Sequence, residues 1–351
     1  MKLFKSLFCL VALLGLLVVL TGCPKSAIMA GQNSTKNPEP RVMYYFEYFD
    51  TVSNIYTYAG DSDEVFNANC QSVAGVLEKY HKLFDIYYEY SGVTNLKTIN
   101  LNAGGEPMKV ESELIDFLLY AKELYTLTNG EMNIMMGSVL SLWHDAREGG
   151  SSIPSDEALS EAALHTSIDL LEIDEKNQTV RISDPKASID VGALGKGYAT
   201  EKAAEYLESI GVTSYVLNIG GNIRIIGTKP DGSGWKTGIK DPKNTSTYAK
   251  YLMISDISCV TSGDYERYYT VDGVRYHHII DKDTLMPATF FSSVTILTAD
   301  SGLADALSTA LFSMSYEDGL AIVNKIGGVE VVWITPDGTV YTTPGIAKLE
   351  P

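Results

Sequence analysis

The chain has 351 residues, of which 44 are acidic and 27 are basic, and its formal net charge is −17. This acidity argues against nucleic acid as a partner and against direct adsorption to an anionic lipid surface. If the ligand carries phosphate, local hydrogen-bond donors or a metal ion must offset the overall field. The length is sufficient for one large domain or two smaller ones.

The first 23 residues predict a lipoprotein signal peptide. Lys2 and Lys5 precede an unbroken apolar run from Leu7 to Leu20, which is short for a membrane span. The following Leu-Thr-Gly-Cys reads as a lipobox, with Cys23 as the lipidated N-terminus of the mature protein. We therefore expect a lipid anchor at the extracytoplasmic face of a bacterial membrane, with an ordinary secretory signal as the alternative.

Removal of that segment would take away two lysines and no acidic residue, so the formal charge would move from −17 to −19. Residues 24–41 are polar and rich in turn formers, which predicts a tether. Residues 42–351 would then form a single domain. Of its cysteines only Cys70 and Cys259 remain, and the sequence allows either one disulfide or two buried thiols.

Taken in chain order, the first elements are a strand and three helices. Aromatic and β-branched residues from Met43 to Ala59 predict a strand or one arm of a hairpin. Apolar residues at helical spacing predict helices over 63–83 and 112–127, the second ending at Asn129-Gly130. A third helix over 153–164 has Ser155 as its N-cap.

The second half alternates strands and helices without a strict βαβ rhythm. Strands are expected at 168–173, 179–183, 214–219, 223–227 and 294–297, hairpins at 267–280 and 329–342, and helices at 200–210, 303–314 and 316–326. Asp272-Gly273 is a type I′ turn signal within the first of these hairpins. The pattern predicts an α+β fold with a largely antiparallel sheet.

The segment from Asp190 to Thr200 carries a carboxylate, a glycine-rich turn and Lys196 directly before a predicted helix. A strand-turn-helix unit of this kind directs backbone N–H groups and a positive dipole toward a ligand, which suits a phosphate. It is not a Walker A loop, because G-x-x-x-x-G-K-[ST] is absent.

A second candidate site lies in the predicted helix that contains Asp305. Asp305 and Thr309 are four residues apart and share a helix face, with Ser308 beside them. One carboxylate and two hydroxyls are hard oxygen donors that suit Mg²⁺. The alternative is structural, because such hydroxyls often bond back to a helix carbonyl and such a carboxylate often serves the helix dipole.

Two histidines end the predicted 267–280 hairpin. In a strand, His277 and His278 point to opposite faces and cannot chelate one ion together. One can face a ligand while the other faces solvent, and the alternative is that a strand histidine is structural or simply exposed. A hydrolase reading is weak because no G-x-S-x-G nucleophile elbow is present. Tyr87, Tyr88 and Tyr90 are positioned to stack on a flat ring or to form an aromatic edge of the core.

Together, these motifs resemble those of the FAD:protein FMN transferases, the ApbE family of flavin-transferring lipoproteins. The resemblance runs from about Tyr48 to Thr343 and rests on several ordered motifs: Phe49-Asp50-Thr51, Thr128 to Asn133, Asp190 to Ala199, Asn218 to Gly221, His278 to Asp281 and Ala304 to Thr309.

The resemblance implies a tunnelling-type fold (T-fold) with inserted elements. It also implies FAD as substrate, Mg²⁺ on its pyrophosphate, and transfer of the FMN half to a threonine of a partner protein with release of AMP. By position, His278 matches the proposed general base, and the Mg²⁺ ligands would be the Ala193 carbonyl, Asp305, Ser308 and Thr309. The residues implied to bind FAD are Phe49, Tyr87 or Tyr88, Glu131, Met132, Asn133, Asp190, Lys196 and Ile280.

The chain departs from the family pattern at several of these positions. Asn133 stands where aspartate is common, and Phe49 where methionine is frequent. Lys282 and Leu285 replace the proline and glycine of the usual turn after the histidine. Ser308 replaces an aspartate found in some members, which leaves one carboxylate at the implied metal site.

Two other functions use the same residues: a flavin-binding lipoprotein without transfer, and an Mg²⁺-dependent FAD pyrophosphatase that gives FMN and AMP. The chain contains no Asp-Gly-Ala-Thr acceptor motif, so we do not expect it to flavinylate itself. The resemblance implies an acceptor with such a motif in a subunit of an electron-transfer complex.

Overall fold

The computed structural model describes residues 39–351, which fall in one compact unit. The predicted signal peptide, the lipidation site Cys23 and most of the predicted tether lie outside the described residues. Within the described part of the chain, no helix is both long and apolar enough to cross a membrane.

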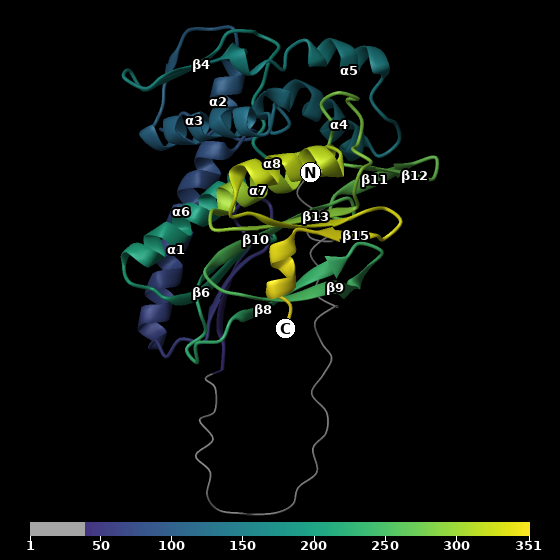
Figure 1. Ribbon diagram of the computed structural model, residues 1–351. Helices are drawn as coiled ribbons and strands as arrows, with labels where there is room; N and C mark the ends of the chain where they lie inside the picture. The colour runs from purple at the N-terminus through teal and green to yellow at the C-terminus, as the bar shows by residue number, and fades with distance from the viewer. Residues whose placement is uncertain (1–38) are drawn as a thin grey trace, which may run out of the picture. The chain divides into compact units, whose positions relative to one another are not determined.

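The centre of the structure is an eight-stranded sheet in which every neighbouring pair is antiparallel (Figure 1). Its strands run in the order β1 (Arg41–Tyr45), β2 (Ser53–Thr57), β6 (Ser214–Ile219), β7 (Asn222–Gly227), β10 (Ile257–Gly263), β13 (Ser293–Thr298), β14 (Glu330–Ile334) and β15 (Val340–Thr342). The central strands are buried on both faces, and β14 shows how. Val331 and Trp333 pack toward one face, while Val332 and Ile334 pack toward the other.

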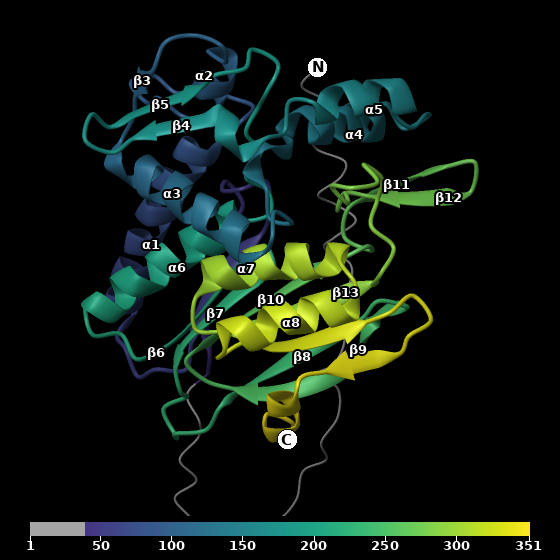
Figure 2. The same ribbon diagram turned by 45° about the horizontal axis from the view of Figure 1, so that its top comes forward.

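Helices cover one face of this sheet, and a hairpin covers the other (Figures 1 and 2). The helices are α1 (Asp63–Phe84), α6 (Gly195–Ser209), α7 (Ser301–Ala310) with its 3₁₀ extension η4 (Leu311–Ser313), and α8 (Tyr316–Ile326). The hairpin is formed by β8 (Trp235–Asp241) and β9 (Asn244–Ile254), accompanied by the 3₁₀ turn η5 (Pro344–Lys348). Helix α6 packs against both α1 and α7, so α7 is held between α6 and strands β10 and β13.

A second group of elements lies beyond the end of α6 and α7 (Figure 2). It contains a three-stranded antiparallel sheet and several helices, joined to the large sheet through a continuous core. The elements are α2 (Leu96–Leu101), β3 (Met108–Lys109), α3 (Ser112–Leu127), η2 (Ile134–Met136), α4 (Gly137–Gly149), α5 (Asp156–Ala163), η3 (Ile168–Leu170), β4 (Leu171–Asp174) and β5 (Thr179–Ile182). The hairpin of β11 (Tyr268–Val271) and β12 (Val274–His277) reaches toward α4 and α5, where Tyr269 and Tyr276 pack against the cluster around Trp143.

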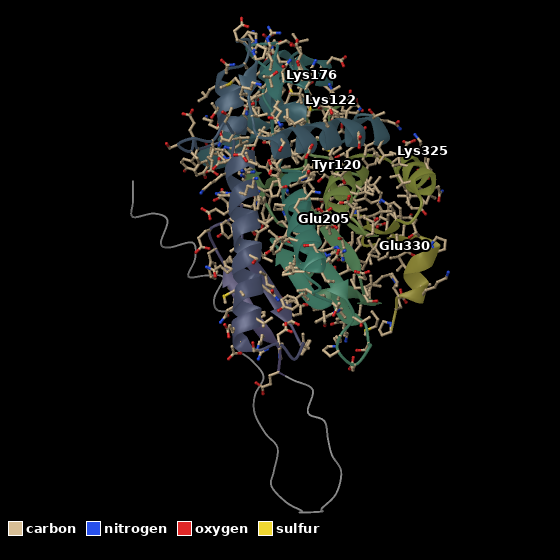
Figure 3. All side chains as sticks on the ribbon, turned by 90° about the vertical axis from the view of Figure 1, so that its left-hand side faces the viewer. Tyr120, Lys122, Lys176, Glu205, Lys325 and Glu330 are labelled. Atoms are coloured by element: carbon tan, nitrogen blue, oxygen red, sulfur yellow. The ribbon has the colours of Figure 1, made fainter. Side chains whose placement is uncertain are left out.

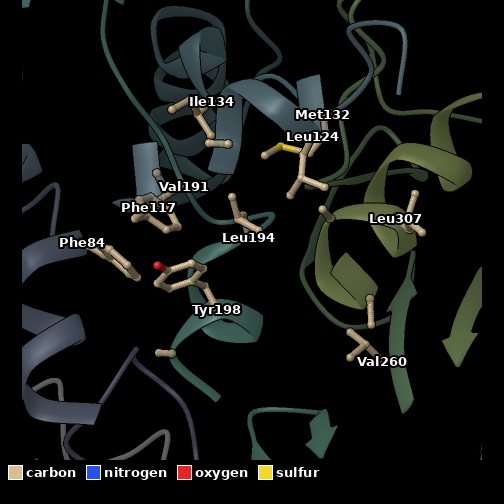
Figure 4. Close-up of a cluster of buried hydrophobic side chains, with 14 of the residues drawn as sticks. Phe84, Phe117, Leu124, Met132, Ile134, Val191, Leu194, Tyr198, Val260 and Leu307 are labelled. Carbon is tan, nitrogen blue, oxygen red and sulfur yellow. The ribbon is translucent and has the colours of Figure 1, made fainter. Parts of the chain in front are cut away.

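The core is densest where α6 begins. Tyr198 is surrounded by the rings of Tyr80, Phe84 and Phe117, and Leu194 is fully buried beside them (Figure 4). Tyr120 on α3, labelled in Figure 3, donates a hydrogen bond of 3.0 Å to the carboxylate of Asp300, the N-cap residue of α7. The start of α6 and the start of α7 are therefore fixed by the same group of buried contacts.

The α+β class with antiparallel sheets is confirmed, as are the long helix α1 and the Ser155 cap of α5. The strand expected between Met43 and Ala59 is present as two paired strands, β1 and β2. The type I′ turn is also present, with φ of 49° at Asp272 and 80° at Gly273. Cys70 and Cys259 are both free and buried, so of the two alternatives the structure has thiols.

Three predictions about local structure were wrong. No strand leads directly into the glycine-rich segment, because β5 ends at Ile182, and the helix begins at Gly195, five residues before the predicted start at Thr200. Residues 168–170 form a 3₁₀ turn and not strand. The expectation of helix only from Thr200 was wrong because glycines carry low helix propensity, which burial of Gly195, Gly197 and Tyr198 overrides here.

A buried ion cluster ties α6 to the sheet behind it. The guanidinium of Arg224 on β7 lies 3.4 Å from Glu201, 2.8 Å from Glu208 and 3.4 Å from Asp256, and its side chain is only 7% exposed. Glu201 in turn accepts a hydrogen bond of 2.7 Å from the backbone N–H of Ser301, the first residue of α7. The cluster therefore connects β7, α6 and α7.

We expect Arg224→Ala to lower the free energy of unfolding by about 3–5 kcal/mol, because Glu201 would be left buried without its cation. Urea denaturation of the described domain measures this change. The control is Lys240→Ala, which removes an exposed pair with Glu266 and is expected to cost about 0–1 kcal/mol. Equal effects of the two substitutions would contradict the role assigned to Arg224.

Candidate functional site

The glycine-rich segment and the Asp305 segment meet where α6 crosses α7. The backbone N–H of Gly197 donates a hydrogen bond of 2.8 Å to Oδ2 of Asp305. A Cβ atom at Gly197 would overlap the Ser301 carbonyl and the Asp305 side chain, so only glycine permits this close crossing. The two candidate sites that the sequence separates by more than a hundred residues thus form one site.

Asp305 is a buried carboxylate with few partners. It is 4% exposed, and within residues 39–351 its one ion-pair partner is Lys196, whose Nζ lies 3.7 Å from Oδ2. Burial raises the pKa of the Asp305 carboxyl, whereas Lys196, the Gly197 N–H and the Asn222 amide oppose that rise. A further cation at this site would therefore favour the ionised form of the Asp305 carboxyl.

Three hydroxyl groups lie at the next turn of α7. Ser308 is fully buried, donates a hydrogen bond of 2.8 Å to the Asp305 carbonyl, and lies 2.8 Å from the hydroxyl of Ser262 on β10. Thr309 is only partly buried, and its hydroxyl is 3.4 Å from Ser262. The Ser308 hydroxyl is thus committed to structural hydrogen bonds, while that of Thr309 retains capacity for a ligand.

The donors at this crossing are oxygens, and they fit a hard divalent cation. Among residues 39–351, no group of three or more His, Cys, Asp or Glu side chains is placed to hold a metal ion. Buried Oδ1 of Asn222, beside Asp305, has no hydrogen-bond partner in the described structure. One carboxylate, hydroxyl and carbonyl oxygens, and such an orphaned acceptor form a donor set of the kind Mg²⁺ takes.

The loop before α6 carries Asp190, Gly192 and Ala193. Oδ1 of Asp190 accepts a 2.8 Å hydrogen bond from the Gly192 N–H, and the loop continues past Ala193 into the first turn of α6, where Lys196 Nζ is 3.4 Å from the Gly192 carbonyl. Burial raises the pKa of Asp190, and the Gly192 N–H and the neighbouring side chains of His144, Arg267 and Arg147 oppose that rise. Although the protein is strongly acidic, cationic side chains therefore gather around this loop.

The two histidines have different environments, but the expectation that both lie in a strand was wrong, because β12 ends at His277. His277 is buried against the ring of Phe312 and bonds through Nε2 to the Ala288 carbonyl at 2.8 Å. His278 lies just beyond β12, and its Nδ1 is 3.2 Å from the Arg267 carbonyl. Because a carbonyl can only accept, Nδ1 carries the proton and Nε2 of His278 keeps its lone pair.

Burial lowers the pKa of His278 to about 3, and the charges of Arg267, His277 and Lys196 add to this effect. The imidazole is therefore neutral at physiological pH. It is available to accept a proton wherever a bound anion favours the imidazolium.

The aromatic residues implied to line a flavin form two groups. Phe49 is partly buried at the β1–β2 turn, edge-on to the His81 ring at a centroid distance of 5.6 Å. Tyr87 and Tyr88 are more than half exposed on the loop after α1, and Tyr87 lies 5.5 Å from the His144 ring. Both groups have aromatic surface that is not fully buried in the core.

The Thr128–Asn133 segment is mainly structural in its side chains. The Met132 side chain is in the core, and Asn133 caps η2 and donates to the Thr166 carbonyl, so neither side chain points at a ligand. Glu131 is different: it pairs with Lys282 at 3.2 Å and borders a cavity of about 340 Å³ between the end of α3 and α8. Ile280 packs against the cluster around Trp143.

Four residues at or near the site carried no signal in the sequence analysis: His81, Asn222, Ser262 and Arg267. Each belongs to a different element, α1, β7, β10 and the start of the β11–β12 hairpin. Asn222 directly follows the Asn218–Gly221 motif in the sequence. A spacing rule could not find the others, because their proximity to the motifs is set by the order of strands in the sheet.

The chain matches the model of the ApbE family over residues 49–333. It is 33% identical over 268 residues to the FAD:protein FMN transferase of Treponema pallidum, covering 72% of this chain and 73% of the relative. The enzyme of the same name from Vibrio cholerae is 32% identical, with coverage of 71% and 75%.

Solved structures agree with the sequence comparison. The ApbE protein of Thermotoga maritima superposes with a TM-score of 0.80 at 29% identity, covering 89% of this chain and 100% of the other. The flavin transferase ApbE of Vibrio cholerae gives a TM-score of 0.74 at 27% identity, with 88% and 99% covered. With the ordered motifs gathered at one crossing of helices, these matches show that the chain belongs to the ApbE family.

Proposed function

We propose that this protein transfers the FMN moiety of FAD to a threonine hydroxyl of a partner protein, with release of AMP. The observation that supports this most directly is the meeting of Lys196, Asp305 and Thr309 at the α6–α7 crossing, because that set can hold a cation and a pyrophosphate together. The curated relatives are named for this transfer.

The Mg²⁺ ligands would be Asp305, Thr309 and the Ala193 carbonyl. We assign Thr309 above Ser308 because the Ser308 hydroxyl already makes two structural hydrogen bonds. The bound cation would supply Lewis-acid stabilisation of charge on the phosphate oxygens. Lys196 would bind those same oxygens, and Asp190 would hold the adenine-nucleotide part of FAD.

The flavin ring would lie between the Phe49 turn and the Tyr87–Tyr88 loop, with Glu131 and Ile280 at its edge. Because the side chains of Met132 and Asn133 are used by the fold, any contact from them would come from the backbone. Ring stacking on aromatic side chains is worth about 0.5–1.5 kcal/mol per pair beyond area burial.

His278 would act as the general base. Its Nδ1–H bond to the Arg267 carbonyl fixes the tautomer, so Nε2 receives the proton of the acceptor threonine. The threonine oxygen then bonds to the FMN phosphorus, and the bond from that phosphorus to the AMP phosphate oxygen breaks. The negative charge of bound FAD favours the imidazolium, which offsets the low pKa of the free site.

The place of action would be the extracytoplasmic face of a bacterial membrane, through a lipid on Cys23. The acceptor would carry an Asp-Gly-Ala-Thr-like motif in a subunit of an electron-transfer complex. Both proposals rest on the sequence, and the acidity of the chain agrees with a protein partner that is not nucleic acid.

The decisive experiment uses a soluble form lacking residues 1–23, FAD, Mg²⁺ and a domain that carries an Asp-Gly-Ala-Thr motif. In-gel flavin fluorescence and mass spectrometry detect FMN on the threonine, and chromatography detects AMP. Metal-dependent labelling with equal AMP is the expected result. Release of free FMN and AMP without labelling would favour a pyrophosphatase, and tightly bound intact FAD would favour a binding protein.

We expect Asp305→Asn to raise the free energy of unfolding of the metal-free protein by about 0.5–2 kcal/mol, because a buried charge is removed while Oδ1 of asparagine still accepts from Gly197. The same variant should lose the rise in melting temperature that Mg²⁺ with FAD gives the wild type. Differential scanning fluorimetry with and without a chelator measures both effects. A variant that keeps the metal response would contradict the assignment of Asp305.

Thr309→Val and Ser308→Ala are a matched pair of substitutions. They distinguish a hydroxyl that would bind the metal ion from a hydroxyl that only makes structural hydrogen bonds. The first should weaken the apparent Mg²⁺ affinity in the transfer assay about tenfold or more with little change in stability. The second should cost about 1–3 kcal/mol of stability because Ser262 loses a buried partner, with less effect on metal dependence. The reverse pattern would show that Ser308 is the ligand.

His278→Asn should lower kcat by about 10²–10⁴-fold with the fold intact, since asparagine keeps the donor to Arg267 and lacks the base. In the wild type, kcat/KM should show no ionisation of His278 near its ordinary pKa, because its pKa in the free protein is about 3. Rate profiles from pH 5 to 8 test this directly. An acid limb centred near pH 6.5 that disappears in the variant would contradict the assigned environment.

A further inference from the structure

The two aromatic segments proposed to hold the flavin are joined by His81. This residue lies in the last turn of α1, between the Phe49–Asp50 turn and the Tyr87–Tyr88 loop. Its ring lies 5.6 Å from that of Phe49 and 6.3 Å from that of Tyr90. No motif of the sequence analysis includes it.

The hydrogen bonds of His81 run in one direction. The backbone N–H of Phe49 donates to Nδ1 of His81 at 3.2 Å, so Nδ1 carries the lone pair and Nε2 carries the proton. Nε2 is 3.3 Å from the Tyr90 hydroxyl, to which it therefore donates. The Tyr90 hydroxyl donates to Oδ2 of Asp85 at 2.8 Å.

Asp85 links Tyr90 to the Tyr87–Tyr88 loop through hydrogen bonds. Its Oδ1 accepts the backbone N–H groups of Tyr87 at 2.6 Å and of Tyr88 at 2.9 Å. Asp85 itself is buried, whereas Tyr87 and Tyr88 are more than half exposed, so these bonds are partly shielded from water. The chain of donors and acceptors from Phe49 through His81, Tyr90 and Asp85 to Tyr87, which we call the His81 relay, fixes both segments to one another.

The Phe49 turn depends on such a restraint. Phe49 and Asp50 have φ of 55° and 48°, in the left-handed region that non-glycine residues avoid at a cost of about 1–2 kcal/mol each. Strained residues persist only where the surroundings hold them. The bond from the Phe49 N–H to His81 restrains this turn at the strained residue itself.

We propose that His81 is a positioning residue for flavin binding, which sets the spacing between the Phe49 wall and the Tyr87–Tyr88 wall of the site. The inference rests on the proposed function, because it assumes that the ring lies between these walls. His81 is expected to affect the affinity for FAD, while the chemical step depends on the residues at the α6–α7 crossing.

The test compares His81→Ala, His81→Asn and Tyr90→Phe with the wild type, each as the soluble chain lacking residues 1–23. FAD is titrated into each protein in the absence of acceptor, and binding is monitored by flavin fluorescence. Loss of a hydrogen bond is expected to weaken FAD binding about threefold to tenfold for His81→Ala and for Tyr90→Phe. His81→Asn keeps an acceptor at the position of Nδ1 and should recover part of the loss. In transfer assays, KM for FAD should rise while kcat at saturating FAD changes by less than about twofold.

Gln71→Ala, on the exposed side of α1, is the matched control and should leave the FAD affinity unchanged. Melting temperatures identify a variant that fails to fold, and in that case His81→Asn and Tyr90→Phe decide the matter. Wild-type affinity in all three variants would overturn the role of His81 while leaving the proposed function intact. Failure of the wild-type chain to bind FAD would overturn the proposed function, and the inference with it.

Discussion

The site depends on one interaction, the hydrogen bond from the Gly197 N–H to the buried carboxylate of Asp305. It requires α6 and α7 to approach so closely that only glycine fits at the crossing. The contact brings Lys196, 3.7 Å from Asp305 Oδ2, to the helix that carries Thr309 one turn further on. Three sets of contacts hold the two helices in this crossing. They are the Arg224 ion cluster behind α6, the Tyr120–Asp300 hydrogen bond at the start of α7, and the aromatic rings around Tyr198.

The charge distribution resolves an apparent conflict between an acidic protein and an anionic ligand. The chain carries a formal charge of −17, yet Lys196, Arg147 and Arg267 act on the groups around the Asp190 loop. Burial disfavours the ionised form of Asp305, and a bound cation would offset that penalty. A buried carboxylate that is poorly compensated by protein groups is a common feature of sites that trade stability for function.

The departures from the family pattern have structural consequences around the loop that follows His278. Leu285 adopts φ of 60° where the family pattern has glycine, and its carbonyl accepts the Trp143 indole N–H at 2.9 Å. Its side chain packs against the Trp143 cluster, which offsets part of the backbone strain. Lys282, in place of proline, pairs with Glu131 at 3.2 Å and links this loop to the Thr128–Asn133 segment.

The sequence by itself determined the α+β class, most helices and hairpins, and the family, because amphipathic periodicity, N-caps and the Asp272-Gly273 turn act locally, and ordered motifs survive in sequence. It also identified Asp305, Thr309, Lys196 and His278 as candidates. It could not show that helix α6 starts at Gly195, that Ser308 is tied to Ser262, or that the Met132 and Asn133 side chains belong to the fold. The position of His81 between Phe49 and Tyr90 was equally hidden. These facts were decided only by tertiary structure, because they depend on contacts between strands and helices far apart in the chain, and no local pattern encodes such contacts.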